Sequence, residues 1–99
     1  MQVQRALDPT DMTELEKKHT PVITADVAQG IAMVVVGYIP HPMEEDHHIE
    51  WIELYKDDDL VERIELEPTS EAKAVFKINL DGQFRAISSC NQHGVWESL

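Results

Sequence analysis

After Thr20 the chain alternates between apolar and polar residues, which is the pattern of half-buried β-strands. The alternation is clearest over residues 72–78, where Phe76 falls on the apolar side. Strand patterns occupy residues 21–23, 31–38, 48–55, 60–66, 72–78, 84–86 and 95–96. No segment with helical periodicity separates them, so a fold that alternates helices with strands is not expected.

Turn-forming residues divide these segments at residues 57–59, at Pro68 and at residues 81–82. Six or seven short strands at this spacing predict an all-β fold, an immunoglobulin-like antiparallel β-sandwich of about seven strands. Trp51 and Phe76 are expected in its core.

The first 18 residues are mostly polar and lack the strand pattern. Asp8 followed by Pro9 predicts the start of a short helix, with Asp8 as the cap and Pro9 in the first turn. The chain shows no repeat and no interior linker. We therefore expect one domain over residues 1–99, with residues 1–18 as its polar N-terminal segment.

Composition narrows the class of protein. The 99 residues are 42% hydrophobic and 27% charged, which is ordinary for a globular protein. A formal net charge of −11 argues against nucleic acid or an anionic membrane as a partner, since both require a basic surface. No apolar run is long enough to span a bilayer and no export signal is visible, so a cytoplasmic location is expected.

Histidine and cysteine are the candidate chemical residues. Cys90 is the only cysteine, so no internal disulfide can form, and His93 follows it at a spacing that suits metal binding. Three of the five histidines lie within residues 41–48. His48 is expected to point away from His47, because adjacent residues of an extended segment face opposite sides. Spacing alone leaves open a metal site and an interaction domain with incidental histidines.

The number of candidate ligands bears on the identity of a metal. Four imidazoles and one thiolate exceed the four ligands of a closed tetrahedral zinc site. Imidazole also suits iron and copper, and five protein ligands leave one coordination position for a small molecule. This set favours redox catalysis, with a zinc- or copper-binding module without turnover as the alternative.

Three segments resemble the superoxide reductases, also called neelaredoxins, and the iron-binding domain of desulfoferrodoxins. Residues 18–23 (KHTPVI) are similar to the family's Lys-His-x-Pro-Val-Ile. Residues 41–54 (HPMEEDHHIEWIEL) are nearly the family pattern, except that His48 stands where an aromatic residue is usual. Residues 90–96 (CNQHGVW) match Cys-Asn-x-His-Gly-x-Trp. The segments run in the family's order, and the resemblance extends from about Glu16 to Trp96.

The resemblance implies a one-iron superoxide reductase, which reduces superoxide to hydrogen peroxide without dismutation. It implies one non-haem iron per chain, cycling between Fe2+ and Fe3+. The implied ligands are His19, His41, His47 and His93 in the equatorial plane and Cys90 in the axial position. Lys18 is implied as the residue that attracts superoxide and helps deliver protons. A rubredoxin-like electron donor and a dimer or tetramer are also implied. The short N-terminus has no cysteine, so the extra rubredoxin-like domain of the two-iron class is not expected.

The sequence departs from the family pattern just before the first ligand. The family has a glutamate before the lysine, and that glutamate can close the sixth iron position in the ferric state. Here Lys17 occupies the glutamate's place and Glu16 is shifted by one residue. A protonated lysine has no lone pair, so Lys17 cannot act as that ligand. We expect the ferric position to stay open, with Glu16 as the alternative ligand.

Overall fold

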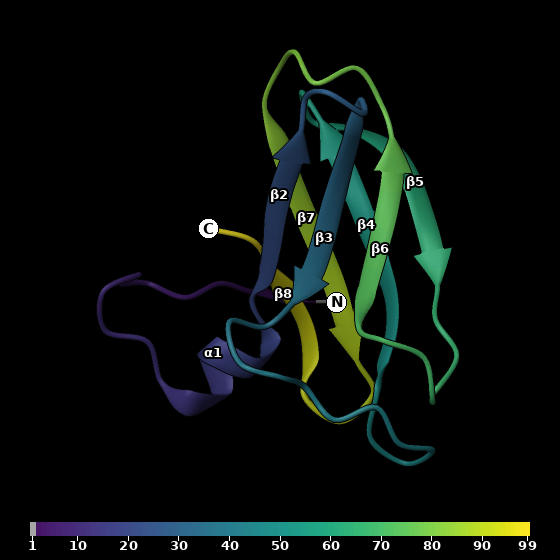
Figure 1. The fold of residues 1–99 in the computed structure, drawn as a ribbon. Helices are drawn as coiled ribbons and strands as arrows, with labels where there is room; N and C mark the ends of the chain where they lie inside the picture. The colour runs from purple at the N-terminus through teal and green to yellow at the C-terminus, as the bar shows by residue number, and fades with distance from the viewer. Residues whose placement is uncertain (1) are drawn as a thin grey trace.

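The protein is described here by a computed structural model that covers residues 2–99 and forms two β-sheets with one short helix (Figure 1). In chain order the elements are β1 (Val3–Gln4), α1 (Glu14–His19), β2 (Pro21–Asp26), β3 (Ile31–Val36), β4 (Ile49–Lys56), β5 (Asp59–Glu65), β6 (Lys73–Lys77), β7 (Phe84–Cys90) and β8 (Gly94–Glu97). One sheet has the strand order β1-β8-β7-β4-β5, and the other has the order β2-β3-β6. Neighbouring strands are antiparallel except β1 and β8, which are parallel.

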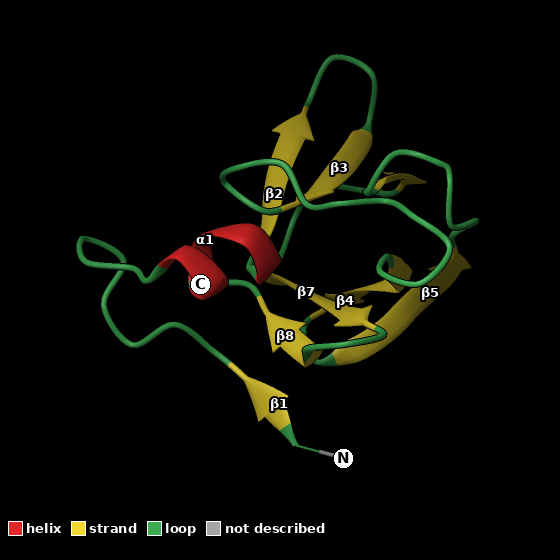
Figure 2. Cartoon of the chain, turned by 90° about the horizontal axis from the view of Figure 1, so that it is seen from below, coloured by secondary structure: helices red, strands yellow, loops and turns green. Residues whose placement is uncertain are grey.

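The two sheets pack face to face, and the core lies between them (Figure 2). Strand β3 alternates strictly, so Ala32, Val34 and Val36 point inward. On β6, Phe76 is 1% exposed, which agrees with the prediction that it is a core residue. The predicted all-β sandwich is confirmed, and the seven predicted strands correspond to β2 through β8.

The prediction that Trp51 is a core residue is wrong. A β-bulge lies between Ile49 and Trp51 in the pairing of β4 with β7, and the extra residue reverses the side to which later side chains point. Ile49 and Ile52 are therefore both buried, whereas Trp51 is only partly buried. The Arg63 guanidinium covers its ring at 4.0 Å from the centroid.

The predicted helix start at Asp8 is also wrong. The Asp8 carboxylate instead accepts hydrogen bonds from the Thr10 backbone N–H at 2.9 Å and from its hydroxyl at 2.7 Å, which closes a local turn. The helix begins at Glu14, because Thr13 and Glu16 form a reciprocal capping box. Asp8 and Thr13 are both good caps, and only Thr13 has a glutamate three residues later.

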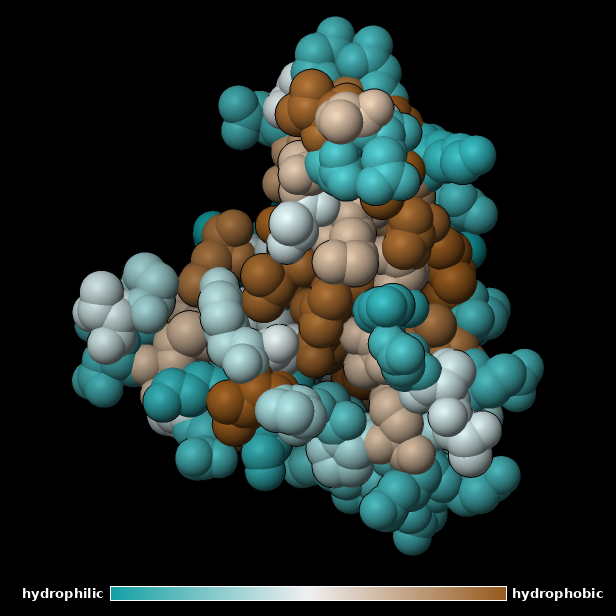
Figure 3. Space-filling view, viewed as in Figure 1, coloured by the Kyte–Doolittle hydropathy of each residue, from teal (hydrophilic) through white to brown (hydrophobic). Residues whose placement is uncertain are grey.

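Apolar side chains remain on the outer face of the small sheet. Met33 and Val35 are partly buried there, Val75 is exposed, and Figure 3 shows apolar residues gathered over this side. The helix is six residues long, and nothing in residues 2–99 forms a helix long and apolar enough to cross a membrane.

Candidate metal centre

His19 is the last residue of α1, and its position depends on a close contact between the helix end and the chain after β3. The Gly37 N–H donates to the Thr20 carbonyl, and the Tyr38 N–H donates to the Lys17 carbonyl at 2.7 Å. Gly37 has φ +96°, and a Cβ there would lie 2.7 Å from the Lys18 carbonyl oxygen. A glycine is required here, and it allows His19 to approach the β3–β4 loop.

His41 and His47 lie on that loop, which folds back on itself. Glu44 and His47 exchange two backbone hydrogen bonds, of 2.9 and 3.2 Å. The turn between β7 and β8 carries Cys90, the last residue of β7, and His93. The five predicted ligands thus come from three places in the fold: the helix end, one loop and one turn.

The four histidine rings form a closed cycle. Their centroids are 4.6 Å apart for His19 and His41, 4.9 Å for His41 and His47, 5.2 Å for His47 and His93, and 4.8 Å for His93 and His19. All four contacts are edge to face. Each imidazole therefore has two of the others as neighbours, as expected if all four surround one point.

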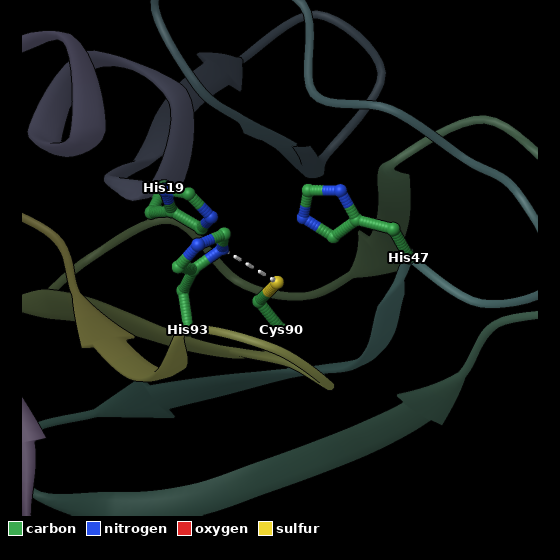
Figure 4. A group of neighbouring side chains, drawn as sticks. All are labelled: His19, His47, Cys90 and His93. Carbon is green, nitrogen blue, oxygen red and sulfur yellow. Dashed lines mark hydrogen bonds between the residues drawn. The ribbon is translucent and has the colours of Figure 1, made fainter.

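Cys90 lies beside this cycle. Its sulfur and one nitrogen each of His19, His47 and His93 all lie within 4.8 Å of one another (Figure 4). The Sγ atom is 3.7 Å from His93 Nδ1. His41 is outside this tightest group, but its Nε2 is 3.0 Å from His19 Nε2. His48 is outside the group, and its Nδ1 lies 3.1 Å from the Glu44 carbonyl oxygen.

The rings of His19 and His41 are held in the tautomer that a metal ligand needs. His19 Nδ1 is 2.7 Å from the Leu15 carbonyl oxygen, and His41 Nδ1 is 2.7 Å from that of Pro42. A carbonyl only accepts, so both Nδ1 atoms carry the proton and both Nε2 atoms keep a lone pair. Burial lowers the pKa of His41 to about 4, and burial also lowers the pKa of His19. Both imidazoles are therefore neutral near pH 7.

Nitrogen lone pairs without a hydrogen-bond donor indicate that a cation fits the site. The Nε2 atoms of His19 and His41 face each other at 3.0 Å with no proton between them when both rings are neutral. The buried Nε2 of His47 has no hydrogen-bond partner among the described residues. A buried polar atom without a partner is destabilising, and a cation bound by these lone pairs would satisfy all three. Three imidazoles and one thiol, with His41 adjacent, therefore suit a metal ion such as iron or zinc.

A cleft of about 330 Å³ opens in front of the rings. Its walls are formed by Glu14, Leu15, Lys18, His19, His41, Pro42, His47 and His93. Cys90 is not among these residues, so the cleft gives access to the imidazoles and not to the thiol. Lys17 lines a separate cleft together with Tyr38. Lys18 is thus the lysine of this pair that faces the site.

Glu16 is directed away from the cleft. Its carboxylate accepts the Thr13 backbone N–H at 2.8 Å as part of the capping box. Glu14, one helical turn before Lys18, provides the carboxylate that lines the cleft. The sequence did not suggest Glu14, because the family pattern directs attention to the residue immediately before the lysine.

Asn91 also lies outside the predicted set. Its Oδ1 accepts the His48 backbone N–H at 2.9 Å, and its Nδ2 donates to the Asp46 carbonyl at 3.0 Å. These two bonds tie the loop that carries His47 to the turn that carries Cys90. The position of Asn91 next to the cysteine was the only hint of this role in the sequence.

The fold and site together define a β-sandwich protein with a histidine–cysteine cluster suited to one metal ion. The Desulfoferrodoxin family model matches residues 11–99. The chain belongs to this family, which confirms the resemblance seen in the sequence.

Individual relatives agree with this assignment. A desulfoferrodoxin homolog of Methanothermobacter thermautotrophicus is 42% identical over 80 residues, which cover 81% of this chain and 62% of that protein. A superoxide reductase of Pyrococcus horikoshii is 39% identical over 97 residues, covering 83% of this chain and 84% of that one. The crystal structure of the superoxide reductase from Treponema pallidum superimposes with a TM-score of 0.76 at 30% identity, covering 86% of this chain and 67% of that one.

Proposed function

We propose that this chain is a one-iron superoxide reductase. The observation that carries the proposal is the closed cycle of four imidazoles with the Cys90 thiol beside it. The proposed ligands of a single iron are His19, His41, His47, His93 and Cys90. Proteins named superoxide reductases, of similar sequence and fold, support the same activity for this chain.

Iron bound here would supply the single electron that reduces superoxide to hydrogen peroxide, with thiolate ligation increasing its electron density. The carbonyl contacts of His19 and His41 keep the imidazoles oriented, and burial of the two rings lowers their pKa and keeps them neutral. The cleft between Lys18 and the rings admits a small anion. It is large enough for a diatomic substrate together with water as the source of protons.

Lys18 is proposed to guide the anion. The chain carries a net charge of −11, which repels superoxide at long range. Within about 8–10 Å, the Debye length at physiological salt, the Lys18 ammonium acts locally and offers three N–H donors. The ammonium at the rim of the cleft therefore stabilises the anion close to the site, whereas the net negative charge of the protein repels the anion at longer distance.

We further propose that an electron-carrier protein of the rubredoxin type restores the ferrous state and that the protein is a homo-oligomer. Both follow from the family resemblance. The ferric position is proposed to stay open to solvent, since Glu16 is engaged with Thr13 and Lys17 lies in another cleft.

The test starts with metal analysis and the visible spectrum of the oxidised protein. We expect one iron per chain and a thiolate-to-iron absorption band that Cys90→Ser abolishes, because a hydroxyl does not replace a thiolate donor. The reduced protein should consume superoxide without releasing dioxygen. A colourless zinc protein would support the alternative of a metal-binding module without turnover, and dioxygen release would indicate dismutation instead.

A further inference from the structure

The backbone carbonyl of His93 accepts two side-chain hydrogen bonds. Gln4 Nε2 donates to it at 2.8 Å, and Trp96 Nε1 donates to it at 3.0 Å. This carbonyl belongs to the turn that carries both Cys90 and His93. Two donors on one oxygen fix the orientation of the peptide that follows His93, and with it the direction in which the His93 side chain leaves the backbone.

His93 needs this restraint more than His19 and His41 do. The Nδ1 atoms of His19 and His41 are each fixed by a carbonyl, and both rings are buried. His93 is exposed, and within residues 2–99 the only hydrogen-bond contact of its ring is with the Cys90 sulfur. Its orientation therefore depends on its backbone.

Gln4 reaches the turn because β1 pairs in parallel with β8. Val3 lies opposite Val95 and Gln4 lies opposite Trp96. Gly94 then leaves room for the amide: a Cβ at this position would lie 3.0 Å from Gln4 Nε2. Gly94 also has φ +83°, which a residue with a side chain rarely adopts. The glycine allows both the turn and the passage of the Gln4 side chain over it.

Trp96 connects this contact to a second ligand. Its ring is nearly parallel to that of His19, with centroids 5.5 Å apart and an interplanar angle of 27°. The indole, which is 4% exposed, thus packs on one proposed ligand and donates its N–H to the backbone of another. Loss of a hydrogen bond to the His93 carbonyl is therefore expected to affect the positions of both His93 and His19.

We infer that Gln4 is a positioning residue of the metal centre, through which the N-terminal strand clamps the turn that carries Cys90 and His93. The inference rests on the proposed function in one respect, that a metal binds at this site. It adds a residue 89 positions away from the ligand that it orients. Loss of the Gln4 donor should let the exposed His93 sample other orientations, which weakens binding and alters the geometry of the bound metal.

The test compares Gln4→Met, which keeps the length of the side chain and removes the donor, with Gln2→Met as the matched control. Gln2 is exposed and precedes β1. Metal-free protein is titrated with Co2+, whose bond to a thiolate gives an absorption band that reports ligand geometry. We expect Gln4→Met to bind Co2+ about tenfold more weakly, at the lower end of the effect of removing partners of metal ligands. Its thiolate band should shift, while Gln2→Met should match the wild type.

Trp96→Phe keeps an aromatic ring against His19 and removes the second donor. If both donors act on the same carbonyl, the double variant should lose more affinity than the two single variants together, since only it leaves that oxygen without either partner. Trp96→Phe alone also tests the clamp if Gln4→Met does not fold.

Equal Co2+ affinity and an unchanged absorption band in Gln4→Met would overturn the inference. A lower melting temperature of metal-free Gln4→Met with an unchanged absorption band would overturn it as well. If the wild type itself shows no thiolate band with Co2+, the proposed metal centre fails instead.

Discussion

At the scale of single residues, two adjacent lysines of α1 have different surroundings. Lys18 lines the cleft in front of the histidines, whereas Lys17 lines the cleft next to Tyr38. Successive residues of a helix point about 100° apart, which explains why only one of them faces the site. The pair therefore offers a variant and a control with the same change in charge.

Lys18→Ala should slow the reaction with superoxide about tenfold, because it removes the local positive charge that attracts the anion. Lys17→Ala should have a much smaller effect. Added salt screens the repulsion by the net charge of −11 in both proteins and the attraction by Lys18 only in the wild type, so the rate should rise with salt more steeply in Lys18→Ala than in the wild type. Pulse radiolysis at several ionic strengths measures both effects. Equal rates and equal salt dependence in the two variants would exclude Lys18 from the mechanism.

At the scale of elements, the strands were predictable and their irregularities were not. Alternation located β2 through β8 because each strand has one buried face. The bulge after Ile49 left no mark on the apolar pattern, so Trp51 was assigned to the wrong face. The helix start was misplaced because Asp8 caps a turn as readily as it caps a helix.

The candidate site, too, could be predicted only in part from the sequence. The five proposed ligands were singled out because histidine and cysteine are metal-binding residue types and because the segments that carry them resemble those of the family. Gln4 was not found, because its contact with His93 spans 89 positions and depends on the parallel pairing of β1 with β8. Glu14 was not found either, since its place in the cleft follows from where the helix begins.

The capping box of α1 gives a prediction about Glu16. Glu16→Ala removes the acceptor of the Thr13 N–H and should lower the free energy of unfolding by about 0.5–1 kcal/mol. Glu16→Gln keeps an acceptor and should retain most of that stability. Neither change should alter the visible spectrum of the oxidised iron protein, because the carboxylate is held away from the cleft. A shifted spectrum in both variants would show that Glu16 reaches the iron.

Strand β6 provides a test of the core. Phe76 is buried between the sheets, and Val75, its neighbour, is 47% exposed on the outer face. Phe76→Ala should lower the free energy of unfolding by about 3–5 kcal/mol through loss of contacts and formation of a cavity. Val75→Ala should cost about 0.5 kcal/mol or less. Denaturant unfolding measures both, and similar losses in the two variants would contradict the register of this strand.

At the scale of the whole molecule, the proposed metal site joins three segments that come from both sheets. Helix α1 precedes β2 in the small sheet, the loop with His41 and His47 connects β3 of the small sheet to β4 of the large one, and Cys90 and His93 belong to the large sheet (Figure 1). These segments lie far apart in an unfolded chain. An ion bound by all of them therefore stabilises the folded state and holds the two sheets together at one end.

Removal of the metal should therefore lower the melting temperature of the whole protein. A ligand that binds only the folded state stabilises it by about 4 kcal/mol when its free concentration is about 1,000 times Kd. For a chain of 99 residues, this corresponds to a rise in Tm of about 15 °C or more. Scanning calorimetry of the chelated and the Fe2+-loaded protein, both without dioxygen, measures the difference. Cys90→Ser should show a smaller rise, because it lacks one of the five proposed ligands. If the chelated and loaded wild-type proteins melt together, the cluster is not a site that joins these segments through a bound ion.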